Sequence, residues 1–217
     1  MSPEAWPPAP SVSLPTHHES PPRPFQPISR FAYCLYAVLA AYTLAKFVGL
    51  AHRYGIHARQ AMWTDSALQS GLMFAGFLIL LGWTYRAYSN LSVLGATNLA
   101  CSPSMAVAYH FVPIAGLIKP FLIYGEIVRA TNVTETGRGR MSEWVASAIP
   151  ALAIWWMTYL FSLVTGILWA AHGQPYLVSP TVLTIVDTIE NLAVARAICV
   201  MTAQQLNKAF AMGIDRT

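Results

Sequence analysis

The sequence predicts an all-α integral membrane protein: a helical bundle of about four transmembrane helices plus a proline-broken helical hairpin. Hydrophobic residues make up 55% of the 217 residues and charged residues only 10%, whereas an ordinary soluble domain carries about 25% charged residues. The apolar residues form long blocks, several of which reach the roughly 20 residues that cross a bilayer core. We therefore expect the lipid bilayer to be a partner of this chain.

The basic residues favour a membrane surface over nucleic acid as their partner. The formal net charge is +4, but the lysines and arginines are few and lie mostly at the ends of apolar blocks, as in anchoring at an anionic membrane face. The three cysteines are far apart and form no CxxC pair, which argues against a disulfide framework and a zinc ribbon. We expect no nucleic-acid partner, no cofactor and no metal.

Two tails are predicted to flank a transmembrane domain at 30–206. Residues 1–29 contain nine prolines and no apolar run of signal-peptide length, so we interpret them as a disordered, proline-rich tail. This tail is a possible ligand for a soluble partner, and His17 and His18 alone are weak evidence for a metal site. Residues 207–217 are predicted to be a short C-terminal tail.

The first two predicted spans are the most apolar blocks. Residues 31–51 carry a single charge, at Lys46, and residues 66–85 carry none and are bounded by Asp65 and Arg86. Both blocks have the length of a transmembrane helix.

Two further spans are predicted in the second half of the chain. The third, 145–171, has Pro150 close to its start, where a helix tolerates proline best. The fourth, 180–203, opens with Ser179 as N-cap and Pro180 at the first helical position. Four polar residues interrupt the fourth span: Asp187, Glu190, Asn191 and Arg196.

Residues 103–130 are predicted to form the proline-broken hairpin. This stretch is apolar but is divided by Pro113, Gly116, Lys119 and Pro120 into pieces too short to span. Non-helical backbone is tolerated at membrane depth only where protein or water satisfies its polar groups. We expect a re-entrant or interfacial hairpin, with a kinked fifth span as the alternative.

The positions of lysine and arginine predict the orientation. The 172–179 loop holds none, whereas the connection between the second and third spans holds five: Arg86, Lys119, Arg129, Arg138 and Arg140. Cytoplasmic loops are enriched in these residues, so this connection is predicted to be cytoplasmic. An even number of spans then places both termini in the cytoplasm.

Two motifs lie before and within the hairpin, R-A-Y-x-N-x-x-x-L-G and S-P-x-x-A-V…F-V-P-I-A-x-L…P. They are carried by Arg86, Ala87, Tyr88, Asn90, Leu94 and Gly95, then by Ser102, Pro103, Ala106, Val107, Phe111, Val112, Pro113, Ile114, Ala115, Leu117 and Pro120, followed by Glu126 and Ile127. With the ending Thr202 to Gln205, this pattern resembles the bacterial family catalogued as domain of unknown function 4328. This chain departs from the family at two places. The family usually has a tryptophan-rich run where this chain has Ala108, Tyr109 and His110, and an asparagine where it has Gly116. Over about 30–206, the resemblance implies a bacterial membrane-embedded domain without an established activity.

The motif positions of unknown role are Arg86, Tyr88, Asn90, Gly95, Ser102, Pro103, Pro113, Pro120 and Glu126. Arg86 either faces the negative end of its helix and lipid phosphate or joins Asn90 in binding hairpin carbonyls that the prolines leave without donors. Glu126 and Arg129 are expected to form a surface pair. His110 is expected to be a buried histidine with one hydrogen-bonded neighbour.

A polar cluster is predicted inside the membrane. Asp187, Glu190 and Asn191 stand at i, i+3 and i+4 on one helical face. At about 1.5 Å per residue, Asp187 lies roughly 10 Å and Lys46 roughly 8 Å below the outer ends of their helices, so we expect them to pair. Glu190 is expected deeper, bonded to Tyr159 or protonated. Three roles are open for these residues: a polar contact that fixes helix packing, a proton or ion path, or side chains that face outward from a shorter helix.

The chain contains no HExxH, no GxSxG and no glycine-rich phosphate loop, so no catalytic residue is predicted. The favoured function is a non-enzymatic scaffold or partner-binding component of a bacterial cytoplasmic (inner) membrane. The alternatives are a small transporter, channel or proton-coupled unit that uses the intramembrane charges and, with least support, an intramembrane enzyme.

Overall fold

The computed structural model describes residues 24–54, 58–131, 143–172 and 179–214. Within these ranges every regular element is a helix, which confirms the all-α prediction. Residues 1–23 of the predicted tail lie outside the described residues. The elements are α1 (Ser29–Tyr54), α2 (Ala58–Val93), α3 (Pro103–Ala108), the 3₁₀ turn η1 (Ala115–Leu117), α4 (Lys119–Thr131), α5 (Glu143–His172) and α6 (Pro180–Ala211).

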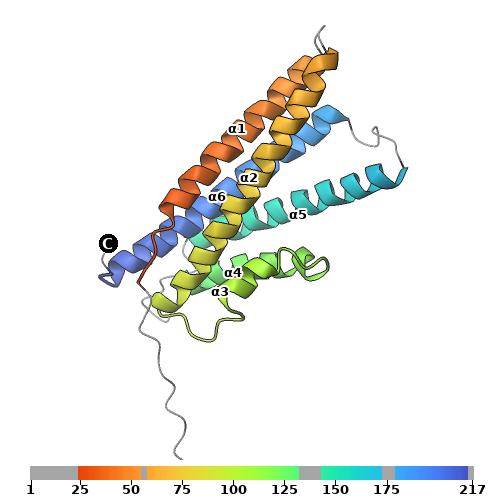
Figure 1. Cartoon of the computed structure of the whole chain (residues 1–217). Helices are drawn as coiled ribbons and strands as arrows, with labels where there is room; N and C mark the ends of the chain where they lie inside the picture. The colour runs from red at the N-terminus through yellow and green to blue at the C-terminus, as the bar shows by residue number, and fades with distance from the viewer. Residues whose placement is uncertain (1–23, 55–57, 132–142, 173–178, 215–217) are drawn as a thin grey trace, which may run out of the picture.

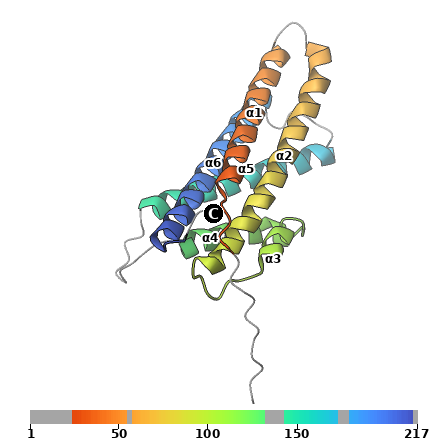
Figure 2. The same cartoon turned by 60° about the vertical axis from the view of Figure 1, so that its left-hand side comes forward.

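The long helices form two antiparallel pairs. α1 packs along α2, α5 packs on α6, and a contact between α1 and α6 joins the pairs. Figures 1 and 2 both show α5 running at a wide angle to the other long helices. α3 and α4 contact α2, and α4 also contacts α5 and α6. The segment between the two helix pairs is therefore part of the packed bundle.

α2 continues two turns beyond its predicted span, 66–85. Arg86 does not end the helix, which continues to Val93. Its guanidinium lies 4.7 Å from the centre of the Phe31 ring of α1, and Tyr88 beyond it is fully buried. The predicted position of Arg86 at the end of the second helix is therefore wrong. The chain leaves α2 through Gly95, whose φ of +79° is a conformation that glycine adopts easily. Helix termination thus explains the motif glycine.

The serines and prolines of the motifs start elements or lie in turns. Ser102 caps α3 by accepting a hydrogen bond from the backbone N–H three residues on, and Pro103 opens the helix. Pro120 lies in the first turn of α4, and Pro113 lies in the turn before η1. Ser179 caps α6 in the same way as Ser102. The hairpin and the fourth predicted helix therefore begin where the sequence indicated.

The last two helices are longer than their predicted spans. α5 starts at Glu143, so Pro150 lies inside the helix rather than at its beginning. α6 runs beyond 203, and residues 207–211, expected in the tail, are helical. The reason is continued packing, because Ala209 is buried against Leu94.

The buried core lies at one end of the bundle, where α2, α4, α5 and α6 meet. Its largest side chains include Trp83, Tyr88, Tyr124, Leu152, Ile198 and Met201. Away from this end, many apolar side chains of the helices are exposed. In water they would form large exposed apolar patches, which soluble proteins rarely have.

Three helices of the described chain are long and apolar enough to cross a membrane, at Ser29–His52, Ala67–Val93 and Ala148–Leu168. Only 6%, 22% and 17% of their most apolar windows is buried inside the protein, as expected when lipid covers a helix. They correspond to the first three predicted spans. α6, which contains the fourth, is not among them.

Candidate functional site

The motif residue Asn90 joins three parts of the chain. Its buried side chain accepts a hydrogen bond from the Gln26 N–H at 3.0 Å and donates to the Gln26 carbonyl at 2.8 Å. It also donates to Gln205 Oε1 at 3.4 Å. Phe25 and Ile28 are buried beside Gln26, so this end of the expected tail is fixed to the bundle. Asn90 therefore binds the segment before α1 and α6, and the alternative in which it binds hairpin carbonyls is wrong.

Motif residues also attach α6 to α2. Gln205 Nε2 donates to the Ala87 carbonyl at 2.9 Å. Thr202 Oγ1 accepts from the indole N–H of Trp83 at 3.1 Å. Both polar α6 residues are buried. The ending that resembles the family thus binds the backbone and a side chain of α2.

Tyr88 and Glu126 attach the hairpin to α2. The Tyr88 hydroxyl donates to Glu126 Oε2 at 2.7 Å, and Glu126 Oε1 accepts from the Ala100 N–H at 2.9 Å. The Tyr88 oxygen also accepts from the Cys101 N–H at 3.2 Å. Glu126 and Arg129 form no ion pair with each other within the described residues, so their expected pairing is wrong.

A second set of hydrogen bonds links α2, α4 and the end of α3. Tyr124 Oη lies 2.9 Å from Thr84 Oγ1 and 3.3 Å from His110 Nε2. His110 Nδ1 lies 3.2 Å from the carbonyls of Ala106 and Val107, so Nδ1 donates and Nε2 accepts from Tyr124. His110 is half-buried rather than buried, and Tyr124 is its one side-chain partner beside the two backbone carbonyls.

The ion pair expected between α1 and α6 is present. Lys46 Nζ lies 2.7 Å from Asp187 Oδ2, and the two side chains are 24% and 18% exposed. The Tyr42 ring centre lies 5.3 Å from the ammonium. One turn away, Asn191 Nδ2 donates to Thr43 Oγ1 at 2.9 Å. Together these contacts join the middle of α1 to α6.

The other two residues of the predicted cluster form no hydrogen bond or ion pair with Lys46 or Asp187 within the described residues. Glu190 is half-buried on α6, and Tyr159 on α5 is 37% exposed. No hydrogen bond joins Glu190 to Tyr159 among the described residues, although both lie within them. The structure therefore brings Lys46, Asp187 and Asn191 into polar contacts between α1 and α6.

Sequence reasoning missed several polar contacts at the core end. Gln26 gave no signal within a proline-rich stretch, and Trp83 and Thr84 read as ordinary members of an apolar block. Lys208 Nζ donates to the Ala130 carbonyl at 2.8 Å and so joins α6 to α4. Desolvation lowers the pKa of Lys208. A basic residue in the last turn of α6 was the one available signal.

The described residues form an all-α fold with three candidate membrane-spanning helices, which is the architecture of a multi-helix membrane protein. A narrower assignment comes from its family. The chain belongs to the family described as Domain of unknown function (DUF4328), whose model matches residues 56–207. This confirms the resemblance seen in the sequence, although α1, included there, precedes the match. No curated protein and no solved structure matches the chain.

Proposed function

We propose that this protein is a non-enzymatic scaffold or partner-binding component of a bacterial inner membrane. The observation that carries the proposal is the pairing of the polar motif groups with one another and with backbone: Tyr88, Asn90, Glu126, Thr202 and Gln205. A catalytic group needs a polar atom that can reach a substrate. Here the motif instead fixes α2, α4, α6 and the segment before α1 to one another.

In this proposal the hairpin is re-entrant and enters the membrane from the cytoplasmic side. Its base is level with Tyr88, and Phe111 at its turn packs edge-to-face on Phe77, with ring centres 5.9 Å apart. Eleven residues of α2 separate these levels, about 16 Å at helical rise. Phe77 belongs to the candidate membrane span of α2, Ala67–Val93. Phe111 and Ile114 are 63% and 80% exposed, which fits a turn surrounded by lipid.

We further propose that α6 is the fourth span and that both termini are cytoplasmic. Its 32 residues extend about 48 Å, more than the roughly 30 Å hydrocarbon core. Asp187 and Asn191 face α1 rather than lipid. Phe25 before α1 packs against Ala209 near the end of α6, and Figure 1 shows these ends of the bundle together. Four spans account for that arrangement.

Reporter fusions test the number of spans. Green fluorescent protein fused to either terminus is expected to fluoresce, and alkaline phosphatase inserted at 175 is expected to be active, because that loop would be outside. A C-terminal fusion that is active only as phosphatase would contradict the four-span proposal.

Deletion of residues 2–23 tests the scaffold proposal. It leaves Phe25 and Ile28 in the core, so membrane abundance should be unchanged while a co-purifying soluble partner is lost. A variant with residues 2–23 in scrambled order keeps composition and length and serves as the control. An unchanged set of co-purifying proteins in the deletion would contradict recruitment by the tail.

A proton-coupled transporter is the second candidate, because Glu190 lies half-buried one turn from the Lys46–Asp187 pair. Reconstituted protein would then dissipate a pH gradient across vesicles, and Asp187→Asn with Glu190→Gln would abolish this at unchanged abundance. A collapse in abundance would instead make the charges structural.

A further inference from the structure

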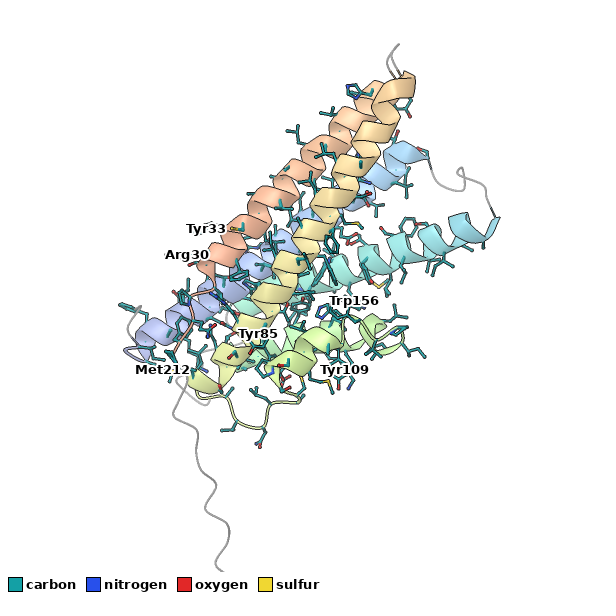
Figure 3. All side chains as sticks on the ribbon, in the orientation of Figure 1. Arg30, Tyr33, Tyr85, Tyr109, Trp156 and Met212 are labelled. Carbon is teal, nitrogen blue, oxygen red and sulfur yellow. The ribbon has the colours of Figure 1, made fainter. Side chains whose placement is uncertain are left out.

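A cavity of about 300 Å³ lies against the hairpin. Cys101, just before the hairpin, and Tyr109, directly after α3, line it together with Lys119, Glu126 and Arg129 of α4. Figure 3 labels Tyr109 on this part of the molecule. The cavity is separate from the Lys46–Asp187 contact and from the bonds around Asn90.

The cavity has an excess of positive charge. Lys119 Nζ lies 5.5 Å from the centre of the Tyr109 ring, and neither Lys119 nor Arg129 forms an ion pair within the described residues. Glu126 is the acidic lining residue, and both its oxygens are held by Tyr88 and Ala100. Its carboxylate is therefore not free to turn toward either cation.

The position of Lys119 beside a candidate membrane span makes this charge unusual. Tyr124 of α4 contacts Thr84 within the candidate span of α2, and Lys119 lies five residues before Tyr124, about 7 Å along the axis of α4. A cation inside a membrane is costly unless a counter-charge or water accompanies it. Exposed Leu122 on α4 adds apolar surface beside the cations.

We propose that this cavity binds the phosphate group of an anionic ligand, with Lys119 and Arg129 as the binding cations. Lysine and arginine are the side chains that recognise phosphate, and basic pockets between membrane helices on the cytoplasmic side bind anionic headgroups. The phosphate comes either from an anionic phospholipid of the same leaflet or from a soluble phosphate compound. This site goes beyond the proposed scaffold role and does not depend on it.

Native mass spectrometry of the full chain in mild detergent tests the proposal, with phosphatidylglycerol, phosphatidylcholine and inorganic phosphate as probes. The variants are Arg129→Gln, the double variant Lys119→Gln/Arg129→Gln and the charge-preserving Lys119→Arg. Arg30→Gln is the matched control, because Arg30 is an exposed arginine on α1, away from Tyr109 in Figure 3. Thermal unfolding of each variant checks that it is folded.

We expect the protein to bind phosphatidylglycerol in preference to phosphatidylcholine. The double variant should bind phosphatidylglycerol about tenfold or more weakly than the unsubstituted protein, and Arg129→Gln should show a smaller loss. Lys119→Arg and Arg30→Gln should bind it as the unsubstituted protein does. If inorganic phosphate binds with the same dependence on the variants and phosphatidylglycerol is not preferred, the site stands and its ligand is soluble. Equal binding of both lipids without phosphate binding would overturn the proposal. The proposal would also be overturned if Arg129→Gln and the double variant, both folded, bound phosphatidylglycerol as tightly as the unsubstituted protein.

Discussion

Asn90 shows, at the scale of single residues, why a polar side chain lies in an apolar core. Its amide offers an acceptor to the Gln26 N–H and a donor to the Gln26 carbonyl, so it pairs with both polar groups of one residue. The Asn90 amide also donates to Gln205, whose own amide nitrogen donates to the Ala87 carbonyl. Loss of Asn90 would leave buried groups on α6 and before α1 without a partner.

Asn90→Leu is expected to lower the free energy of unfolding by about 2 kcal/mol or more, since each buried unpaired group costs roughly 1–3 kcal/mol. Denaturation in mixed detergent micelles measures the change. Ser92→Ala is the control, because Ser92 is exposed two residues further along α2. A loss no larger in Asn90→Leu than in this control would contradict the role assigned to Asn90.

Lys46 and Asp187 allow a test of whether their pair fixes packing. Asp187→Leu alone should destabilise by about 1–3 kcal/mol, below the 3–5 kcal/mol typical of fully buried pairs because both side chains are partly exposed. Lys46→Met/Asp187→Leu should be less destabilised than Asp187→Leu, since no charge then remains unpaired. Equal or greater destabilisation in the double variant would contradict the coupling.

These two sites show which residue contacts the sequence can predict. Lys46 and Asp187 could be paired because each is a rare charge in an apolar block and their depths match. The partner of Asn90 could not be found, because Gln26 lies among prolines that indicate a tail. The carboxylate of Glu126 has a basic neighbour one turn away, Arg129, yet binds Tyr88 through tertiary packing that spacing along one helix does not reveal.

At the scale of elements, α2 is one of the helices that hold the bundle together. It contacts α1, α3, α4 and α6. Its length was underestimated because Arg86 and Asn90 look like residues that face water, whereas packing buries the helix to Leu94. The hairpin limits were predicted well because Ser102, Pro103 and Pro120 act locally on the backbone. Its attachment to α2 could not be predicted, since it depends on contacts distant in sequence.

Gly82 on α2 tests the close approach of α1. A Cβ there would lie 2.6 Å from the Phe31 ring, whereas at Gly71 nothing lies within 4 Å. Gly82→Ala should be about 1 kcal/mol less stable than Gly71→Ala, because both gain similar helix propensity but one must displace the ring. Adding Phe31→Leu should reduce the difference. Equal stability of the two alanine variants, measured by thermal unfolding in detergent, would contradict this packing.

At the scale of the whole molecule, lipid acts as the solvent for the outer surfaces of the helices. Block length and charge depletion predicted the class because they follow directly from bilayer thickness. The concentration of the core at one end could not be predicted, because α4 fills the space between α2, α5 and α6 only there. Away from this core, the helices have exposed apolar side chains, such as Leu44 on α1 and Met73 on α2.

The depth of Ile114 tests most directly whether the hairpin enters the bilayer and returns. A spin label at Ile114, in a chain with its three cysteines replaced by alanine, is compared with labels at Leu44 in the middle of α1 and at Asn98 beyond α2. The label at Ile114 should be accessible to oxygen and shielded from water-soluble nickel, as at Leu44. Accessibility to nickel equal to that at Asn98 would contradict the re-entrant hairpin and the membrane arrangement built on it.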